Sequence, residues 1–195
     1  MKFVIGLGNP SERYEETRHN IGRDIVRSLI KKFKFDDFVY DKKVCASLSE
    51  GKIGREKVLL ILPDTYMNNS GLALKKFINN KKKALDMVVI HDELDMGVGS
   101  SKIVFNKSSG GHRGVESVIR AVKTEAFPRI KIGISPTTGM GKIKKPSGEK
   151  AVVAHVLGKF SSKEQEILKK IKKKTVDSIE TIVTDGYLLA MNKFN

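Results

Sequence analysis

The sequence contains very little of several residue types, and each shortage excludes a class of protein. It has one cysteine and no tryptophan among its 195 residues. A single cysteine cannot form an internal disulfide, so a reducing compartment is expected, with Cys45 as a buried structural thiol. No apolar run approaches the roughly 18 to 20 residues that a membrane span requires. The N-terminal apolar run is too short for a signal peptide. We therefore expect a cytoplasmic protein with no membrane partner.

Acidic residues are also scarce relative to basic ones. The chain has 37 Lys and Arg against 22 Asp and Glu, which gives a formal net charge of +15. Such an excess predicts a polyanionic partner, either nucleic acid or an anionic membrane, although a generally lysine-rich composition is an alternative. The sequence lacks zinc-finger spacing and an aromatic-rich basic stripe, so we expect contacts with phosphates rather than reading of bases.

Short apolar runs alternate with helical patterns along the whole chain, which is typical of an α/β protein. The segments 21–33 and 115–122 have the apolar spacing of amphipathic helices, and a short helix is expected near 70–79. Predicted strands lie at 2–7, within 44–50, and at 57–62, 87–92, 102–106 and 129–134. No linker separates two cores. We predict one α/β domain over residues 1–195, with a twisted, mixed and mostly parallel sheet that has helices on both faces.

The C-terminal third has a different composition. Residues 135–150 are rich in Pro, Gly, Thr and Lys, which predicts a long, mobile, basic loop. Ser161 and Glu164 form a capping-box pattern that opens a helical segment over 161–192, and Gly186 is expected to end its first helix.

Four polar clusters follow the apolar runs, at 8–10, 17–20, 66–69 and 91–93. Taken singly, each has an ordinary explanation as a turn, a helix cap or a solvated strand end. In open α/β sheets, however, ligands bind beyond the carboxyl ends of the strands. We therefore expect these clusters to meet there and form a site.

The residue types in these clusters are suited to hydrolysis by an activated water molecule. His19 is the natural general base, and Asp92 at a strand end is a candidate to fix its tautomer and stabilise its charged form. Side-chain amides such as those of Asn9 and Asn68 can hold a carbonyl group in register. The chain has no GxSxG elbow, and nothing near Cys45 is arranged to activate it, so a protein nucleophile is not expected.

The ordered set of motifs resembles the bacterial type of peptidyl-tRNA hydrolase. The motifs are GLGNP, TRHNIG, PDTYMNNSG, HDELD, GGH, IGI and VLGKF, between residue 3 and about residue 190. The resemblance implies a mixed sheet with helices on both faces. It also implies a monomeric, metal-independent and cofactor-free esterase with peptidyl-tRNA as its partner. Such an enzyme cleaves the ester between a peptide and the 3′-terminal ribose of tRNA, which recycles tRNA for translation.

The resemblance also assigns roles to individual residues. His19 is implied as the general base with Asp92 as its partner, and Asn9 and Asn68 are implied to hold the peptide and the attacking water. The residues predicted to bind substrate are Tyr14, Met67, Asn68, His112, Arg113 and Lys131.

Arg113 departs from the family pattern, because family members usually have Asn in the GGHNG motif. Near a helix start a cation is unfavourable unless an anion lies close by. Two anions are candidates: Glu116, three residues further on, and a phosphate of the substrate.

Three other functions remain as alternatives. A catalytically silent relative would bind RNA without cleaving it, which the change at Arg113 allows. A metal-dependent phosphoesterase would use Asp92, Glu93 and Asp95 as ligands. A nucleotide-binding domain would use GLGNP, although this segment lacks the GxGxxG spacing. Sensitivity of the activity to a chelator would separate the phosphoesterase from the hydrolase.

Overall fold

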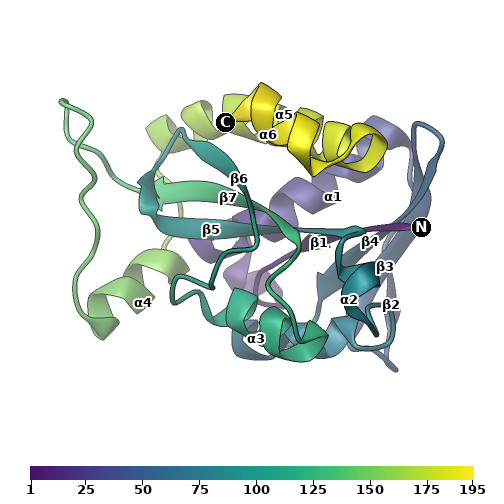
Figure 1. Cartoon of the computed structure of the whole chain (residues 1–195). Helices are drawn as coiled ribbons and strands as arrows, with labels where there is room; N and C mark the ends of the chain where they lie inside the picture. Colours follow the sequence, from purple (N-terminus) through teal and green to yellow (C-terminus); the bar gives the residue numbers. More distant parts are fainter.

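The computed structural model describes all residues from 1 to 195, and its centre is a seven-stranded sheet (Figure 1). The strand order is β2-β3-β4-β1-β5-β7-β6. The four central strands run parallel to one another: β4 (Glu56–Pro63), β1 (Lys2–Gly6), β5 (Met87–Gly97) and β7 (Pro128–Ser135). The edges are antiparallel: β2 (Val39–Asp41), β3 (Ala46–Ile53) and β6 (Ser101–Phe105). The prediction of a mixed, mostly parallel sheet is confirmed.

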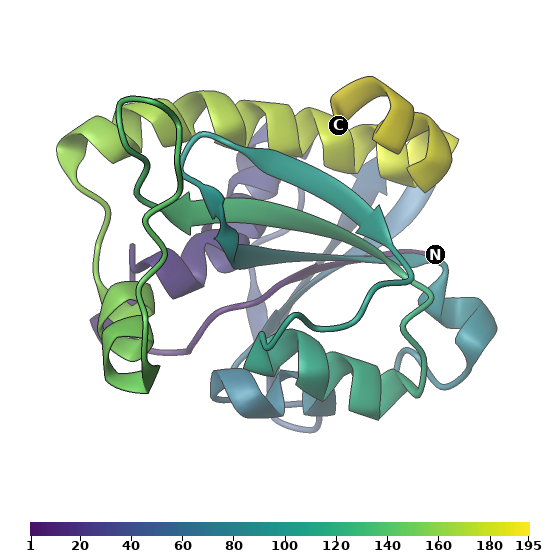
Figure 2. The same ribbon diagram turned by 60° about the vertical axis from the view of Figure 1, so that its left-hand side comes forward.

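Helices cover both faces of this sheet, as predicted (Figure 2). One face packs against α1 (Ile21–Phe33) and α5 (Ser162–Asp185) and contains a core of 25 buried hydrophobic residues. The other face packs against the 3₁₀ helix η3 (Met67–Leu74) and α3 (Arg113–Val122), and its core contains 18 buried hydrophobic residues. Central strands covered on both sides need apolar residues at consecutive positions, which explains the unbroken apolar runs in the sequence.

The remaining helices are short or peripheral. They are the 3₁₀ helices η1 (Glu12–Tyr14) and η2 (Arg18–Asn20), and α2 (Lys81–Ala84), α4 (Glu149–Leu157) and α6 (Tyr187–Phe194). The segment before α4 contains an antiparallel bridge between Thr137 and Ile143, and its predicted mobility stays a prediction. None of the helices is both long and apolar enough to cross a membrane.

Three local expectations differ from the structure. The helix expected near 70–79 is instead the 3₁₀ helix η3, which packs closely on α3: a Cβ on Gly71 would lie 2.2 Å from the Ser117 carbonyl oxygen. Helix α4 begins inside the segment expected to be a loop. Cys45 is exposed rather than buried, because the chain turns there with a positive φ of 50° before β3 begins.

The start of α5 has the capping box that the sequence predicted. The side chain of Ser161 accepts a hydrogen bond from the Glu164 amide, and the Glu164 carboxylate accepts one from the Ser161 amide at 2.7 Å. These bonds satisfy backbone donors that a helix start otherwise leaves free.

Replacing Ser161 with Ala should therefore lower the free energy of unfolding by about 1 kcal/mol. For a chain of this size, that loss corresponds to a fall in Tm of roughly 2 to 4 °C. Thermal unfolding of Ser161→Ala measures it, with Ser162→Ala as the control, because Ser162 is the exposed neighbour that caps nothing. Equal Tm values for the two variants would contradict the prediction.

Candidate active site

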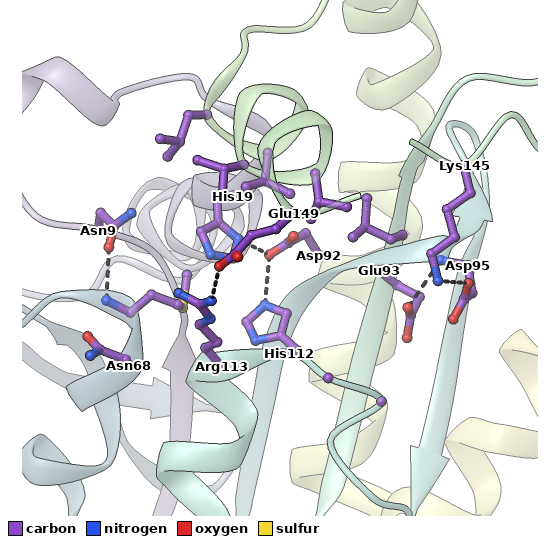
Figure 3. A pocket seen from close by; sticks show the side chains of 18 of the residues that line it. Asn9, His19, Asn68, Asp92, Glu93, Asp95, His112, Arg113, Lys145 and Glu149 are labelled. Carbon is purple, nitrogen blue, oxygen red and sulfur yellow. Dashed lines mark hydrogen bonds and ion pairs between the residues drawn. The ribbon is translucent and has the colours of Figure 1, made fainter. Parts of the chain in front are cut away.

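A cavity of about 430 Å³ opens beyond the carboxyl ends of the central strands, where the sequence predicted a site. This volume is in the range of small-molecule binding pockets. Figure 3 shows its lining side chains. Of the predicted site residues, the cavity brings together Asn9, His19, Met67, Asn68, Asp92, His112 and Arg113.

Asp92 lies at the centre of the site and links two histidines. Its Oδ1 atom is 2.9 Å from His19 Nδ1 and 2.9 Å from His112 Nε2. His19 comes from the segment before α1, whereas His112 is the N-cap of α3 on the opposite face of the sheet. The carboxylate is buried on the central strand β5, and the two histidines approach it from different segments of the chain (Figure 3).

The hydrogen bonds of His112 fix the position of its proton. Its Nδ1 atom accepts bonds from the amides of Gly114 and Val115, at 3.1 and 3.2 Å. An imidazole nitrogen that accepts carries no proton, so Nε2 carries it and donates to Asp92. His112 thus caps a helix with one nitrogen and binds the central carboxylate with the other.

Asp92 and His19 stabilise each other in their charged forms. Burial alone would raise the pKa of Asp92, but the nearby His19 and His112 outweigh it and hold this pKa well below its usual range. Burial lowers the pKa of His19, but the Asp92 carboxylate outweighs it, so this pKa lies above its ordinary value. The charge of Arg113 acts in the opposite direction and lowers it.

The segment that carries His19 is held by the C-terminal part of the chain. The Arg18 guanidinium makes two hydrogen bonds of 2.9 Å to the Glu164 carboxylate and lies over the Phe160 ring at 4.6 Å. The Arg18 amide donates to the Gly158 carbonyl. With Nδ1 directed at Asp92, the other ring nitrogen of His19 has no protein partner, and the ring lines the cavity.

The two predicted asparagines differ in how firmly they are held. Asn9 is buried, its backbone amide donates to Asn20 Oδ1, and its side-chain Oδ1 accepts from the Met67 amide at 2.9 Å. Its side-chain NH₂ group therefore remains available as a donor. Asn68 is exposed at the cavity rim, beside Asn9 in Figure 3.

Three predicted binding residues have other surroundings. Tyr14 lies outside the cavity lining, with the Arg13 guanidinium 4.8 Å from its ring centre. Lys131 also lies outside the lining and forms an ion pair with Glu93. Arg113 pairs with Glu149 of α4 at 2.9 Å, so Glu116 was the wrong anion. The roles of Tyr14 and Lys131 in binding stay predictions.

Sequence reasoning missed one wall of the cavity. Helix α4 contributes Glu149 and the apolar residues Val152, Val153, Val156 and Leu157. The preceding loop contributes Lys145, which pairs with Asp95 of β5 at 2.6 Å. The apolar run in 152–157 was the available signal, but it is too short to identify a helix by periodicity.

The carboxylates proposed for a metal-dependent phosphoesterase do not converge on one point. Asp92 binds the two histidines, Glu93 pairs with Lys131, and Asp95 pairs with Lys145. The ligand atoms of His19, Asp92 and His112 do lie within 4.8 Å of one another, so this trio is the group in the cavity with the spacing of metal ligands. Both histidines already use those atoms in hydrogen bonds to the carboxylate.

Comparison with known proteins gives a consistent result over the whole chain. Residues 3–195 match the family model described as peptidyl-tRNA hydrolase. A relative of that name from Clostridium novyi (strain NT) is 37% identical over 196 residues, covering 100% of this chain and 98% of the relative. One from Clostridium perfringens (strain SM101 / Type A) is also 37% identical, with 100% and 97% covered. The crystal structure of peptidyl-tRNA hydrolase from Acinetobacter baumannii has a TM-score of 0.88 at 31% identity, covering 100% of this chain and 94% of that one.

The balance of charges around His19 predicts how Asp92 controls its titration. In the unaltered protein, the carboxylate keeps the pKa of His19 above its ordinary value. In Asp92→Asn only burial and the Arg113 charge remain, and both favour the neutral ring. An NMR titration of the imidazole signals should therefore show the pKa of His19 falling below about 6.5.

The matched control is Asp95→Asn, which removes another carboxylate of the same cavity that does not bond to His19. The titration of His19 should keep its midpoint in this variant. A midpoint that is equally unchanged in Asp92→Asn would show that the His19–Asp92 contact has no electrostatic role.

Proposed function

The chain belongs to the peptidyl-tRNA hydrolase family, and from this we propose that it cleaves peptidyl-tRNA with a water molecule activated by His19 and Asp92. The bond cleaved is the ester between the peptide and the 3′-terminal ribose. The observation that carries the proposal is the 2.9 Å hydrogen bond from His19 Nδ1 to the buried Asp92, which leaves Nε2 directed to the cavity. The product tRNA would return to translation in the cytoplasm.

In this mechanism His19 first accepts a proton from water and later donates it to the leaving group. Its Nε2 atom takes a proton from water as the water oxygen attacks the ester carbonyl carbon. Asp92 stabilises the resulting imidazolium, as its effect on the pKa of His19 supports. When the bond between the carbonyl carbon and the ribose oxygen breaks, the imidazolium donates the proton to that oxygen. Water is consumed, and a free carboxyl group and a ribose hydroxyl are produced.

The amide groups would hold the substrate during this transfer. The NH₂ group of Asn9 is a positioned donor, because the Oδ1 atom of the same side chain is bound to the Met67 amide. It is suited to bind the carbonyl oxygen, whose negative charge grows as water attacks. Asn68 at the rim can bind the peptide, and Met67 and α4 provide apolar contacts for side chains that vary between substrates.

The nucleic-acid part of the substrate would be bound through charge. The net charge of +15 supports contacts with phosphates, which are common to all tRNAs. Candidate residues for these contacts are Arg113 and Lys131, together with the lysines of 142–150. His112 was also predicted to bind substrate, but both of its ring nitrogens are used within the protein, so any contact it makes would be through the face of its ring. Tyr14 is half-buried and lies in the segment that precedes His19, and it is a candidate for contact with the acceptor end. We expect the protein to act as a monomer, without metal or cofactor.

His19→Ala tests the mechanism. Without the general base, turnover of an N-blocked aminoacyl-tRNA should fall by about 10²- to 10⁴-fold. Release of the blocked amino acid is the measurement, with and without chelator, and circular dichroism checks the fold. Asp95→Asn is the control for a polar change at the cavity rim and should keep turnover near that of the unaltered protein.

The outcomes separate this proposal from its rivals. Near-normal turnover by His19→Ala would exclude His19 as the base. Loss of activity with chelator would favour the metal-dependent alternative. Binding of tRNA by the unaltered protein with no release of the amino acid would favour the silent RNA-binding relative.

Arg113 would add an electrostatic contact with the tRNA. Its side chain is exposed at the cavity rim, and its pair with Glu149 is also exposed. Exposed ion pairs contribute little stability, so a phosphate can replace Glu149 at low cost. Arginine also has the planar donor geometry that matches phosphate oxygens.

Arg113→Asn should weaken binding of the blocked aminoacyl-tRNA and reduce the dependence of log Kd on log salt concentration. Turnover at saturation should be largely kept. The acid limb of the pH–rate profile should move to higher pH, because the positive charge that lowers the pKa of His19 is removed. The control is Arg120→Asn, which removes the same charge from the far end of α3. Equal salt slopes in the two variants would show that Arg113 does not contact the tRNA.

A further inference from the structure

Arg129 is a charged residue with no exposed surface that the mechanism above does not use. It lies on β7 between the buried residues Pro128 and Ile130, and its exposed fraction is 0%. Its Nη2 atom donates to the carbonyl oxygens of Lys107, at 2.6 Å, and of Ser108, at 2.9 Å. Its Nε and Nη1 atoms have no hydrogen-bond partner. Burial of an incompletely paired guanidinium is unfavourable, so its presence needs an explanation other than stability.

The two carbonyls that Arg129 binds belong to the loop that carries His112. This loop, residues 106–112, connects β6 to α3. Three of its residues have a positive φ: Asn106 at 51°, Gly110 at 60° and Gly111 at 82°. Within the loop, the amides of Gly111 and His112 donate to Ser109, so the internal hydrogen bonds lie in its second half. The first half depends on contacts from outside the loop. Arg129 supplies such contacts near the start of the loop, and the helix cap of His112 supplies them at its end.

A second buried group, His91, packs against the ring of His112. His91 of β5 is fully buried, and its ring meets that of His112 edge to face, with the ring centres 4.7 Å apart. Burial, together with His112 and Arg129, holds the pKa of His91 well below its ordinary value, so its ring is neutral. Its Nδ1 atom donates to the Asp92 carbonyl at 2.6 Å. The His91 ring is therefore fixed in position, and the His112 ring packs against it. The position of His112 then depends on the loop that carries it.

We propose that Arg129 is a positioning residue for the reaction: it holds the 106–112 loop so that His112 donates to Asp92. The effect passes from the Lys107 and Ser108 carbonyls through the loop to His112, and from there to the carboxylate that orients His19. Arg129 does not touch the substrate, because it does not line the cavity. The inference rests on the proposed catalytic role of Asp92.

The direct test is Arg129→Lys. Both bonds come from Nη2, and the shorter lysine side chain does not extend its ammonium group as far as that atom. The ammonium group is also more strongly hydrated than a guanidinium, so its burial at this position is more costly. Release of His112 should leave Asp92 with one donor and free to move, and small displacements of this kind lower turnover. We expect kcat for the blocked aminoacyl-tRNA to fall roughly 10- to 100-fold, with KM nearly unchanged.

A double-mutant cycle with His112→Asn distinguishes positioning from a general loss of stability. Asparagine keeps a favourable N-cap for α3 but cannot reach Asp92 as the imidazole does. If Arg129 acts through His112, adding Arg129→Lys to His112→Asn should change kcat by less than about twofold. An effect of Arg129→Lys that is equally large in both backgrounds would overturn the inference, as would an unchanged kcat in Arg129→Lys alone.

Two further variants keep the test decisive. Thr175→Val removes a buried polar atom that also lacks a partner, but on α5 away from the site, so the kcat of this variant should be unchanged.

Gly111→Ala strains the 106–112 loop without a clash, since φ is 82° at Gly111 and no atom lies within 4 Å of the added Cβ. It should lower kcat in the unaltered background and not in His112→Asn. If Arg129→Lys does not fold, equal effects of Gly111→Ala in both backgrounds would overturn the inference. Failure of the water-activation mechanism would instead appear as an active His19→Ala protein.

Discussion

The buried Asp92 carboxylate accepts hydrogen bonds from two histidines that approach it from different segments of the chain. The charged form of this carboxylate depends on both partners, since burial by itself raises the pKa of Asp92 and the two histidines lower it. The histidines in turn depend on their own segments: His19 on the contacts of Arg18 with the C-terminal region, and His112 on the 106–112 loop. Much of the fold outside the cavity therefore acts to hold three side chains together.

The parallel arrangement of the central strands explains why the site forms where it does. In a parallel sheet the carboxyl ends of all strands meet at one edge, so polar residues that follow different strands become neighbours. Asn9 follows β1, and Asp92 lies within β5 near the point where its burial ends. The same arrangement leaves the opposite edge of the sheet free of site residues. Helix α4 then closes the cavity with an apolar wall on one side (Figure 3).

Two kinds of charge serve different parts of the proposed function. The surface lysines give the long-range attraction that any tRNA would experience, and this attraction weakens with salt. The charges inside the site are few and paired, and they set the protonation of single groups. Arg113 belongs to both sets, because it is exposed at the rim and also lowers the pKa of His19.

The sequence by itself determined the features that depend on neighbours in the chain. Apolar runs predicted the central strands, and the Ser161–Glu164 pattern predicted the start of α5, because both signals lie within a few residues. It also indicated His19 and Asp92, which the fold places in contact although 73 residues separate them. Only the tertiary structure decided the partners of the remaining charges. Arg113 pairs with Glu149, 36 residues away, rather than with Glu116, and Arg129 binds a loop that the sequence does not link to it. Such pairs form because packing of the sheet and helices brings distant segments together, and no periodicity in the chain records which segments will meet.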